Sequence, residues 1–108
     1  MKRGDLVTVA MPGDFGKPRP ALVIQSDLFN ASHASITVLL LSSDIVAAPL
    51  FRIDVMPSPK NGLIRHSQVQ VDKIMTVRRE RLGPVIGRLD DSILVAINRA
   101  LAIFLGFV

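Results

Sequence analysis

The chain has no cysteine, tryptophan or tyrosine among its 108 residues, and only two histidines. Without cysteine it can form neither a disulfide nor a thiolate metal site, which favours a cytoplasmic location. His33 and His66 are too few imidazoles for a catalytic zinc site, so we predict no metal and no cofactor. No apolar run approaches the length that spans a bilayer, and the first residues lack the apolar stretch of a signal peptide. We therefore expect no membrane association.

Apolar residues are abundant instead, at 49% of the chain, with a mean hydropathy of +0.42. A chain of this length is expected to form one domain, residues 1–108. A small domain this apolar exposes more hydrophobic surface than a monomer usually carries. A self-complementary contact between two copies would cover that surface, so we expect a homodimer.

Basic side chains are concentrated in one part of the chain, although the net charge is only +4. Residues 60–88 carry seven lysines and arginines against two acidic residues, whereas residues 1–59 carry five of each sign. A basic segment of this kind favours a polyanionic partner such as nucleic acid. A solvated basic face with no ligand is the alternative.

The periodicity predicts five or six short strands, one helical turn at 27–30 and a terminal helix. The seven candidate segments for these strands are 5–11, 21–25, 36–41, 51–55, two within 63–77 with a bend near 72–73, and 85–86. The helix should begin at Asp90 or Asp91, with Asp90 as a good N-cap, and end near Phe104. Since no βαβ rhythm is present, the pattern indicates a mainly β domain with a small, curved antiparallel sheet or partly open barrel.

The most informative local feature is Arg19, which stands between two prolines directly ahead of an apolar run. Each proline fixes its own φ, and Pro20 also favours an extended backbone at Arg19. The guanidinium should therefore project from a stiff loop at a strand start, which is a geometry suited to holding a phosphate. A surface arginine that closes a proline-rich turn is the alternative.

Five segments, in order along the chain, resemble the MazF/PemK (Kid) family of toxin endoribonucleases. They are Arg3-Gly4-Asp5, Arg19-Pro20-Ala21-Leu22-Val23, Leu40-Leu41-Ser42-Ser43, Gly62-Leu63-Ile64-Arg65-His66-Ser67-Gln68 and Gly87-Arg88-Leu89-Asp90-Asp91. The resemblance implies the SH3-like barrel with a C-terminal helix that MazF, Kid and CcdB toxins share. It also implies the toxin of a type II toxin–antitoxin system, a metal-independent and sequence-selective endoribonuclease that cuts single-stranded RNA such as mRNA. The 2′-OH would attack the neighbouring phosphate and leave 2′,3′-cyclic phosphate and 5′-OH ends.

The resemblance assigns cleavage to Arg19 and Ser42. Because the pKa of arginine is above about 12, Arg19 is expected to stabilise the phosphate rather than act as a base. The residues expected to contact RNA are Asp14, Phe15, Lys17, Ser43, Arg65, Ser67 and Gln68. Ser67 stands where some members carry an aspartate proposed as a general base, which leaves His66 or the substrate itself as the proton acceptor. On an extended strand His66 would point away from Arg65 and Ser67.

The expected protein partner is a cognate antitoxin whose disordered, acidic tail covers the RNA groove. A second interpretation rests on residues 97–108, which resemble the C-terminal helix and apolar end of CcdB, a non-enzymatic poison of DNA gyrase. A small barrel that binds nucleic acid without catalysis is the third. The Arg19-Pro20 segment favours the endoribonuclease, because CcdB lacks this type of loop.

Overall fold

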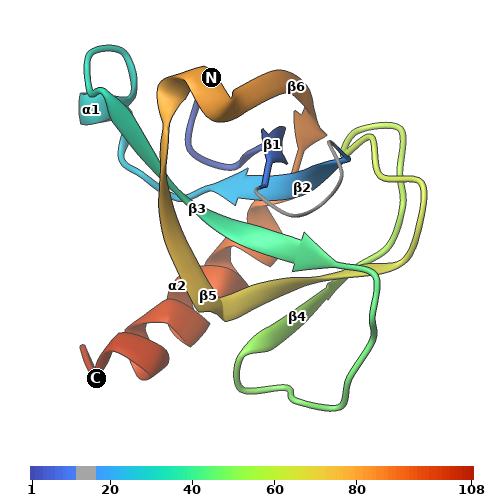
Figure 1. Ribbon diagram of the computed structural model, residues 1–108. Coiled ribbons are helices and arrows are strands. Elements are labelled where there is room, and N and C mark those ends of the chain that lie inside the picture. Colours follow the sequence, from blue (N-terminus) through green and yellow to red (C-terminus); the bar gives the residue numbers. More distant parts are fainter. Residues whose placement is uncertain (12–16) are drawn as a thin grey trace.

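One antiparallel sheet of six strands, in the order β4-β5-β3-β2-β1-β6, organises the computed structural model (Figure 1). The structure describes residues 1–11 and 17–108. The strands are β1 (Asp5–Ala10), β2 (Pro18–Val23), β3 (Ser35–Ser42), β4 (Arg52–Val55), β5 (Ser67–Arg78) and β6 (Leu82–Arg88). The helices are α1 (Asp27–Asn30), the 3-10 turn η1 (Arg79–Arg81) and α2 (Asp91–Leu105). The predicted mainly β fold with a C-terminal helix is confirmed.

β5 is a single bent strand, where the sequence predicted two. Its register with β3 shifts between the pairs Leu39–Ile74 and Leu41–Val69, so β5 holds extra residues at 70–73. The predicted bend near 72–73 therefore lies in this irregularity, which increases the local twist of a sheet. The first part of β5 pairs with both β4 and β3, and its second part continues along β3 alone.

β2 begins earlier than predicted, at Pro18, so Arg19 lies within a strand rather than on a loop. β3 pairs with β2 only at residues 21–23, whereas β1 pairs with β2 along 18–22. The prolines are tolerated because the start of β2 has a partner strand on one side only, where a missing N–H donor costs little.

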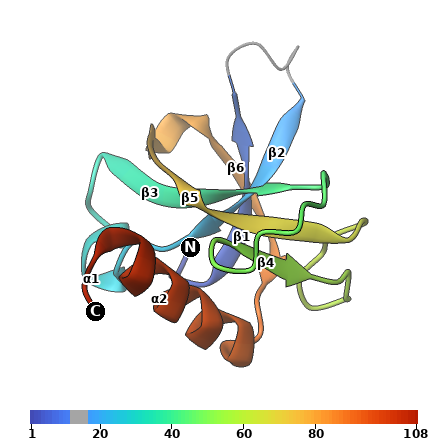
Figure 2. The ribbon, with the colours of Figure 1, turned by 90° about the horizontal axis from the view of Figure 1, so that it is seen from below.

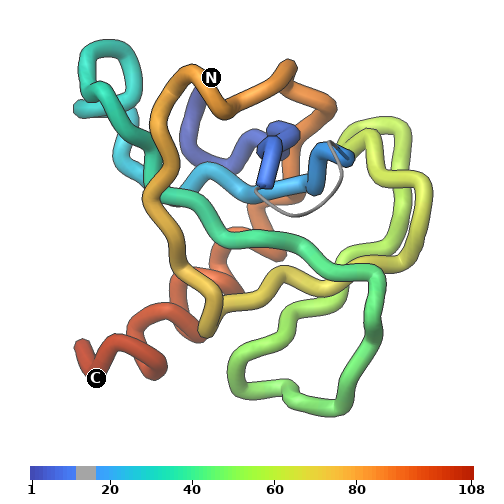
Figure 3. The backbone as a smooth tube through the Cα atoms, in the orientation of Figure 1, coloured from blue at the N-terminus to red at the C-terminus, as the bar shows by residue number. Residues whose placement is uncertain are grey.

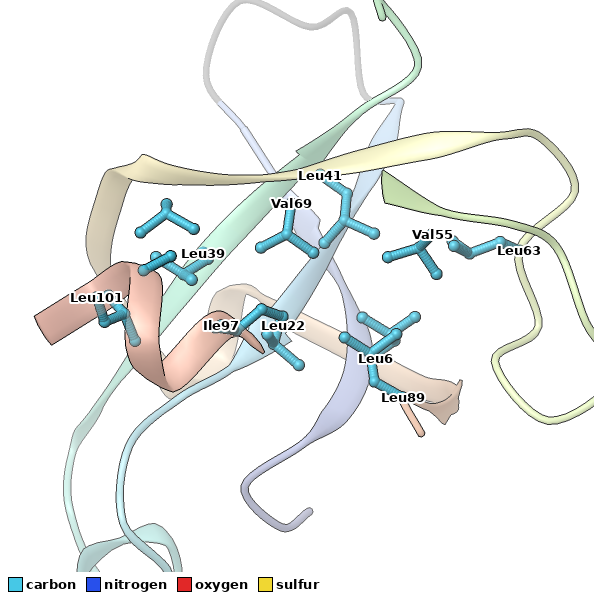
Figure 4. Packing of buried hydrophobic residues seen from close by; sticks show 12 residues of the cluster. Leu6, Leu22, Leu39, Leu41, Val55, Leu63, Val69, Leu89, Ile97 and Leu101 are labelled. Carbon is cyan, nitrogen blue, oxygen red and sulfur yellow. The ribbon is translucent and has the colours of Figure 1, made fainter. Parts of the chain in front are cut away.

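The two faces of the sheet pack differently (Figure 2). α2 runs across one face, and Ile97 and Leu101 contact the buried leucines and valines of the strands there (Figure 4). A second cluster, which includes Val7, Val23 and Ile36, fills the other side of the curved sheet. No described helix combines the length and hydropathy that a bilayer crossing requires.

α2 begins and ends as its sequence predicts. Asp90 occupies the N-cap position, but its side chain does not cap the helix and instead accepts from Lys60 Nζ at 2.9 Å. Gly106 ends the helix in the left-handed conformation, with φ of 79°. Only glycine adopts this conformation without strain, which explains why α2 stops there.

Candidate active site

A groove of about 660 Å³ lies where the start of β2 and the end of β3 meet the segment that leads into β5. Figure 3 traces two long loops, residues 43–51 in green and residues 56–66 in yellow-green. The lining residues are Lys17, Pro18, Arg19, Pro20, Leu41, Ser42, Ser43, Asp44, Gly62, Leu63, Ile64, Arg65, Ser67 and Ile86. The groove thus brings together most of the site residues that the sequence predicted, from three separate parts of the chain.

Arg19 and Ser42 lie on the neighbouring strands β2 and β3. β2 and β3 pair in the order Ala21–Leu40, Leu22–Leu39 and Val23–Val38. β2 and β3 no longer pair beyond Ala21–Leu40, but the same register extended by two residues would set Arg19 opposite Ser42. Directly opposed residues of antiparallel strands point to the same face of a sheet. Both side chains accordingly line the groove.

The Ser42 hydroxyl is oriented by a short local turn. Ser42 Oγ accepts from the backbone N–H of Asp44 at 3.1 Å. An accepted hydrogen bond occupies a lone pair and leaves the hydroxyl proton to be donated elsewhere. Ser67, on the opposite wall, donates its own proton to the Arg65 carbonyl at 3.0 Å.

The wall that carries Arg65 is held by Asn61, which is 5% exposed. Asn61 Oδ1 accepts from the backbone N–H groups of Ser58 and Leu63, at 3.0 and 2.9 Å, and Nδ2 donates to the Met56 carbonyl at 2.8 Å. Gly62 follows with φ of +71°, and a Cβ there would collide with the Ile86 carbonyl. This segment, residues 56–65, is therefore a fixed arm packed on β6; we call it the arm.

Gln68, which the sequence predicts as an RNA contact, is not among the residues that line the groove. It is 2% exposed, and its side chain bonds to Val46, Arg52 and Asp54. Gln68 shares a sheet face with its strand partner Ser42, but the loop at 43–51 lies on its amide through Val46, so Gln68 is buried there.

His66 also lies away from the groove lining. His66 Nε2 is 3.0 Å from Asp54 Oδ1, and Gln68 Nε2 lies at the same distance from that oxygen. The hydrogen bonds from Gln68 and His66 lower the pKa of Asp54. The pKa of Asp27 is likewise lowered, chiefly by the backbone N–H of Arg3, which donates to Oδ1 at 2.7 Å. Both carboxylates accept hydrogen bonds from distant parts of the chain and so stabilise the fold.

Two predicted RNA contacts, Asp14 and Phe15, fall outside the described residues. Of the five that lie within the described residues, Lys17, Ser43, Arg65 and Ser67 line the groove and Gln68 does not.

The basic segment 60–88 does not form one continuous binding face. Arg79 donates to the carbonyls of Asn30 and His33, and Arg88 donates to the Arg3 carbonyl at 2.8 Å. Lys60 and Lys73 pair with Asp90 and Asp72. Of this segment, only Arg65 contributes a cation to the lining of the groove, where Lys17 and Arg19 join it.

Asp44 was not predicted from the sequence, yet it is the one carboxylate among the described lining residues. Its place directly after Ser42-Ser43 is the signal that could have found it. Within the described residues, no group of three or more His, Cys, Asp or Glu side chains could hold a metal ion.

The comparisons with known proteins agree across the whole chain. Residues 2–105 match the family model described as PemK-like, MazF-like toxin of type II toxin–antitoxin system. A probable endoribonuclease MazF of Mycolicibacterium smegmatis is 45% identical over 107 residues, covering 98% of this chain and 97% of the relative. Endoribonuclease EndoA of Bacillus subtilis is 29% identical, covering 100% of this chain and 97% of the relative.

Solved structures share the fold. An endoribonuclease in complex with its cognate antitoxin, from a mycobacterial species, superposes with a TM-score of 0.82 at 24% identity, covering 100% of this chain and 97% of that one. A MazE–MazF structure from Deinococcus radiodurans gives 0.81 at 19% identity, covering 100% and 98%. At these identities the likeness concerns the arrangement of the elements.

Proposed function

Because the chain belongs to the family of PemK-like, MazF-like toxins of type II toxin–antitoxin systems, we propose that its groove is where it cuts single-stranded RNA. The chain is an endoribonuclease toxin, a conclusion that rests on the family match and on 45% identity to a relative of that activity. The gyrase-poison and non-catalytic interpretations are not favoured. The observation that supports this site is that Arg19 on β2 and Ser42 on β3 line the same groove.

The reaction needs no external nucleophile. The ribose 2′-oxygen loses its proton and bonds to the neighbouring phosphorus, the P–O5′ bond breaks, and the 5′-oxygen takes up a proton. Charge accumulates on the phosphate oxygens at the transition state, and donors fixed in place stabilise it. Arg19 binds the two non-bridging oxygens through its planar fork, and Ser42 donates a hydrogen bond to the bridging 5′-oxygen as it departs. Water supplies the proton that this oxygen takes up. No step requires a metal ion.

Asp44 is the group best placed to accept the 2′-OH proton. The sequence left this role to His66 or to the substrate, but His66 lies against Asp54. The Asp44 backbone is fixed on both sides, by Ser42 Oγ at 3.1 Å and by Arg52 Nη1 at 3.1 Å from its carbonyl. A fixed backbone limits where the carboxylate can go and suits a positioned general base.

The groove also suits an antitoxin tail. Lys17, Arg19 and Arg65 supply positive charge, and Leu63, Ile64 and Ile86 supply apolar lining. An acidic, disordered peptide with a few apolar side chains matches both features and would fold on binding. Covering the groove would block RNA, which is how such a partner would neutralise the toxin in the cytoplasm.

The test is incubation of the purified protein with a long single-stranded RNA in excess EDTA. Discrete products with 2′,3′-cyclic phosphate and 5′-OH ends are expected. Intact RNA, or cleavage that appears only when a divalent metal is added, would contradict the proposal. Arg99→Ala, an exposed change on α2 away from the groove, is the control and should cleave as the wild type does.

A further inference from the structure

Gln68 is a buried polar residue whose hydrogen-bonding capacity is fully used. Its Oε1 accepts from Val46 N at 3.1 Å and from Arg52 Nη1 at 3.2 Å. Its Nε2 donates to the Val46 carbonyl and to Asp54 Oδ1, both at 3.0 Å. A primary amide offers two acceptor and two donor sites, and all four are occupied here. The side chain therefore connects separate parts of the chain, and it has no donor or acceptor available for a ligand.

Gln68 forms hydrogen bonds to the loop between β3 and β4, residues 43–51. Val46 lies near the middle of this loop, and its backbone N–H and carbonyl both bond to the Gln68 amide. The amide thus satisfies the two backbone groups that a neighbouring strand would otherwise satisfy. A loop held in this way loses the freedom that long connections usually keep.

A second connection runs from Gln68 to the groove. Arg52 Nη1 contacts Gln68 Oε1 and also donates to the Asp44 carbonyl at 3.1 Å. The Asp44 N–H in turn fixes Ser42 Oγ. Three consecutive hydrogen bonds therefore join the buried amide to the hydroxyl that lines the groove.

Register places the amide on the same face as that hydroxyl. Ser42 on β3 and Gln68 on β5 are direct partners, and Asp54 on β4 is the next partner across. Since opposed residues of antiparallel strands share a face, Ser42, Gln68 and Asp54 form one row across β3, β5 and β4.

We propose that Gln68 is a positioning residue for RNA cleavage, which fixes the wall formed by Ser42, Ser43 and Asp44 through Val46 and Arg52. The inference rests on the proposed function, because it needs that wall to act on RNA. A displacement of about 1 Å in a catalytic group can lower a rate by about 100-fold. Removal of the amide should therefore lower kcat far more than it raises KM.

The experiment compares Gln68→Met with Gln70→Met. Gln70 lies two residues along β5, is 8% exposed, and makes no side-chain hydrogen bond among the described residues. We expect the Val46 amide to exchange hydrogen about 10-fold faster or more in Gln68→Met, and at the wild-type rate in Gln70→Met. At a temperature well below both melting points, kcat should fall about 10-fold or more in Gln68→Met alone, with KM within about 3-fold of wild type.

A second variant keeps the test decisive if Gln68→Met does not fold. Arg52→Met breaks the connection to Asp44 but leaves the bonds from Gln68 to Val46 and Asp54 in place. It should lower kcat with little change in Val46 exchange. Where both proteins fold, the double variant should be no slower than the slower single variant, because the two changes act through one chain of contacts.

Different results would contradict the positioning role of Gln68 and the proposed RNA cleavage. Fast Val46 exchange with a wild-type kcat in Gln68→Met would overturn the positioning role, as would an equal loss of kcat in Gln70→Met. A wild-type protein that leaves RNA intact would contradict the proposed function instead, and the exchange data would still report whether Gln68 holds the loop.

Discussion

At the scale of single residues, the proposed chemistry divides between a cation, a hydroxyl and a carboxylate. Arg19, Ser42 and Asp44 all line the groove, and each reaches it from an extended or locally fixed backbone. Arginine supplies charge without exchanging its proton, so proton acceptance needs a separate group. Asp44 meets that need, and this assignment can be tested by itself.

Asp44→Asn keeps the size of the side chain but removes its ability to accept a proton. General base catalysis contributes typically about 10²- to 10⁴-fold, and we expect a loss of kcat in this range with a smaller change in KM. Single-turnover cleavage of a short RNA measures it. Asp91→Asn, at the exposed start of α2, should cleave normally. An Asp44→Asn protein as fast as wild type would exclude the carboxylate as the base.

Asp54 gives the fold a defined sensitivity to acid. Because Gln68 and His66 lower its pKa in the folded protein, Asp54 stabilises the fold fully above the ordinary aspartate pKa of 3.8. That contribution is lost as the pH falls below 3.8 and through the lowered value. Urea unfolding of wild type and Asp54→Asn should therefore differ by a constant amount above about pH 5 and converge in acid. A difference that grows on acidification would contradict the assignment.

At the scale of elements, the arm shows what the sequence could and could not predict. The turn at 57–62 was predicted from its prolines, asparagine and glycine, and the structure places a turn there. The role of Asn61 was not predicted, because its partners Ser58, Leu63 and Met56 become neighbours only when the arm folds back on itself. A pattern of residue types predicts that the chain turns but not which atoms meet.

The same limit explains the outcome for Gln68. Residue type makes it a plausible RNA contact, yet the loop at 43–51 lies on its amide, so Gln68 is buried while Ser67 lines the groove. Arg19 stood out by its two flanking prolines, whereas Ser42 and the cleavage role of both residues came from family resemblance; the fold shows that both line one groove. The start of β2 was placed too late because prolines were taken to mark a loop.

Gly62→Ala tests the fit of the arm on β6. Gly62 and Gly106 both have positive φ, at +71° and +79°, but a Cβ at Gly62 would strike the Ile86 carbonyl, whereas nothing lies within 4 Å at Gly106. Backbone strain alone costs about 1–3 kcal/mol at either position. We expect Gly62→Ala to lower the free energy of unfolding more than Gly106→Ala, and to weaken cleavage by displacing Arg65. Equal destabilisation in chemical unfolding would show that the arm does not pack on β6.

At the scale of the whole molecule, the surface left by the monomer is strongly apolar around the end of α2. The exposed large side chains there are Ile103, Phe104, Leu105, Phe107 and Val108, and Phe107 and Val108 are 78% and 90% exposed. Soluble monomers rarely expose a contiguous patch of this kind. A two-fold contact between copies would cover it.

We therefore expect sedimentation at micromolar concentration to give about twice the 11.8 kDa chain mass. Replacing two exposed residues together, Ile103→Lys with Phe107→Lys, should shift the protein toward monomer without unfolding it, since neither side chain belongs to the core. A wild-type protein that sediments as a monomer at this concentration and cleaves RNA would refute the dimer.

The central claim is that Arg19, which lines one groove with Ser42, stabilises the phosphate during RNA cleavage. The most direct measurement is the single-turnover cleavage rate in EDTA for wild type, Arg19→Ala and Arg19→Lys, with native circular dichroism as the control for folding. Removal of such a charge-stabilising donor costs about 10²- to 10³-fold, and lysine should recover little because a point charge cannot reproduce the planar fork. A natively folded Arg19→Ala protein that cleaves RNA at the wild-type rate would contradict the account.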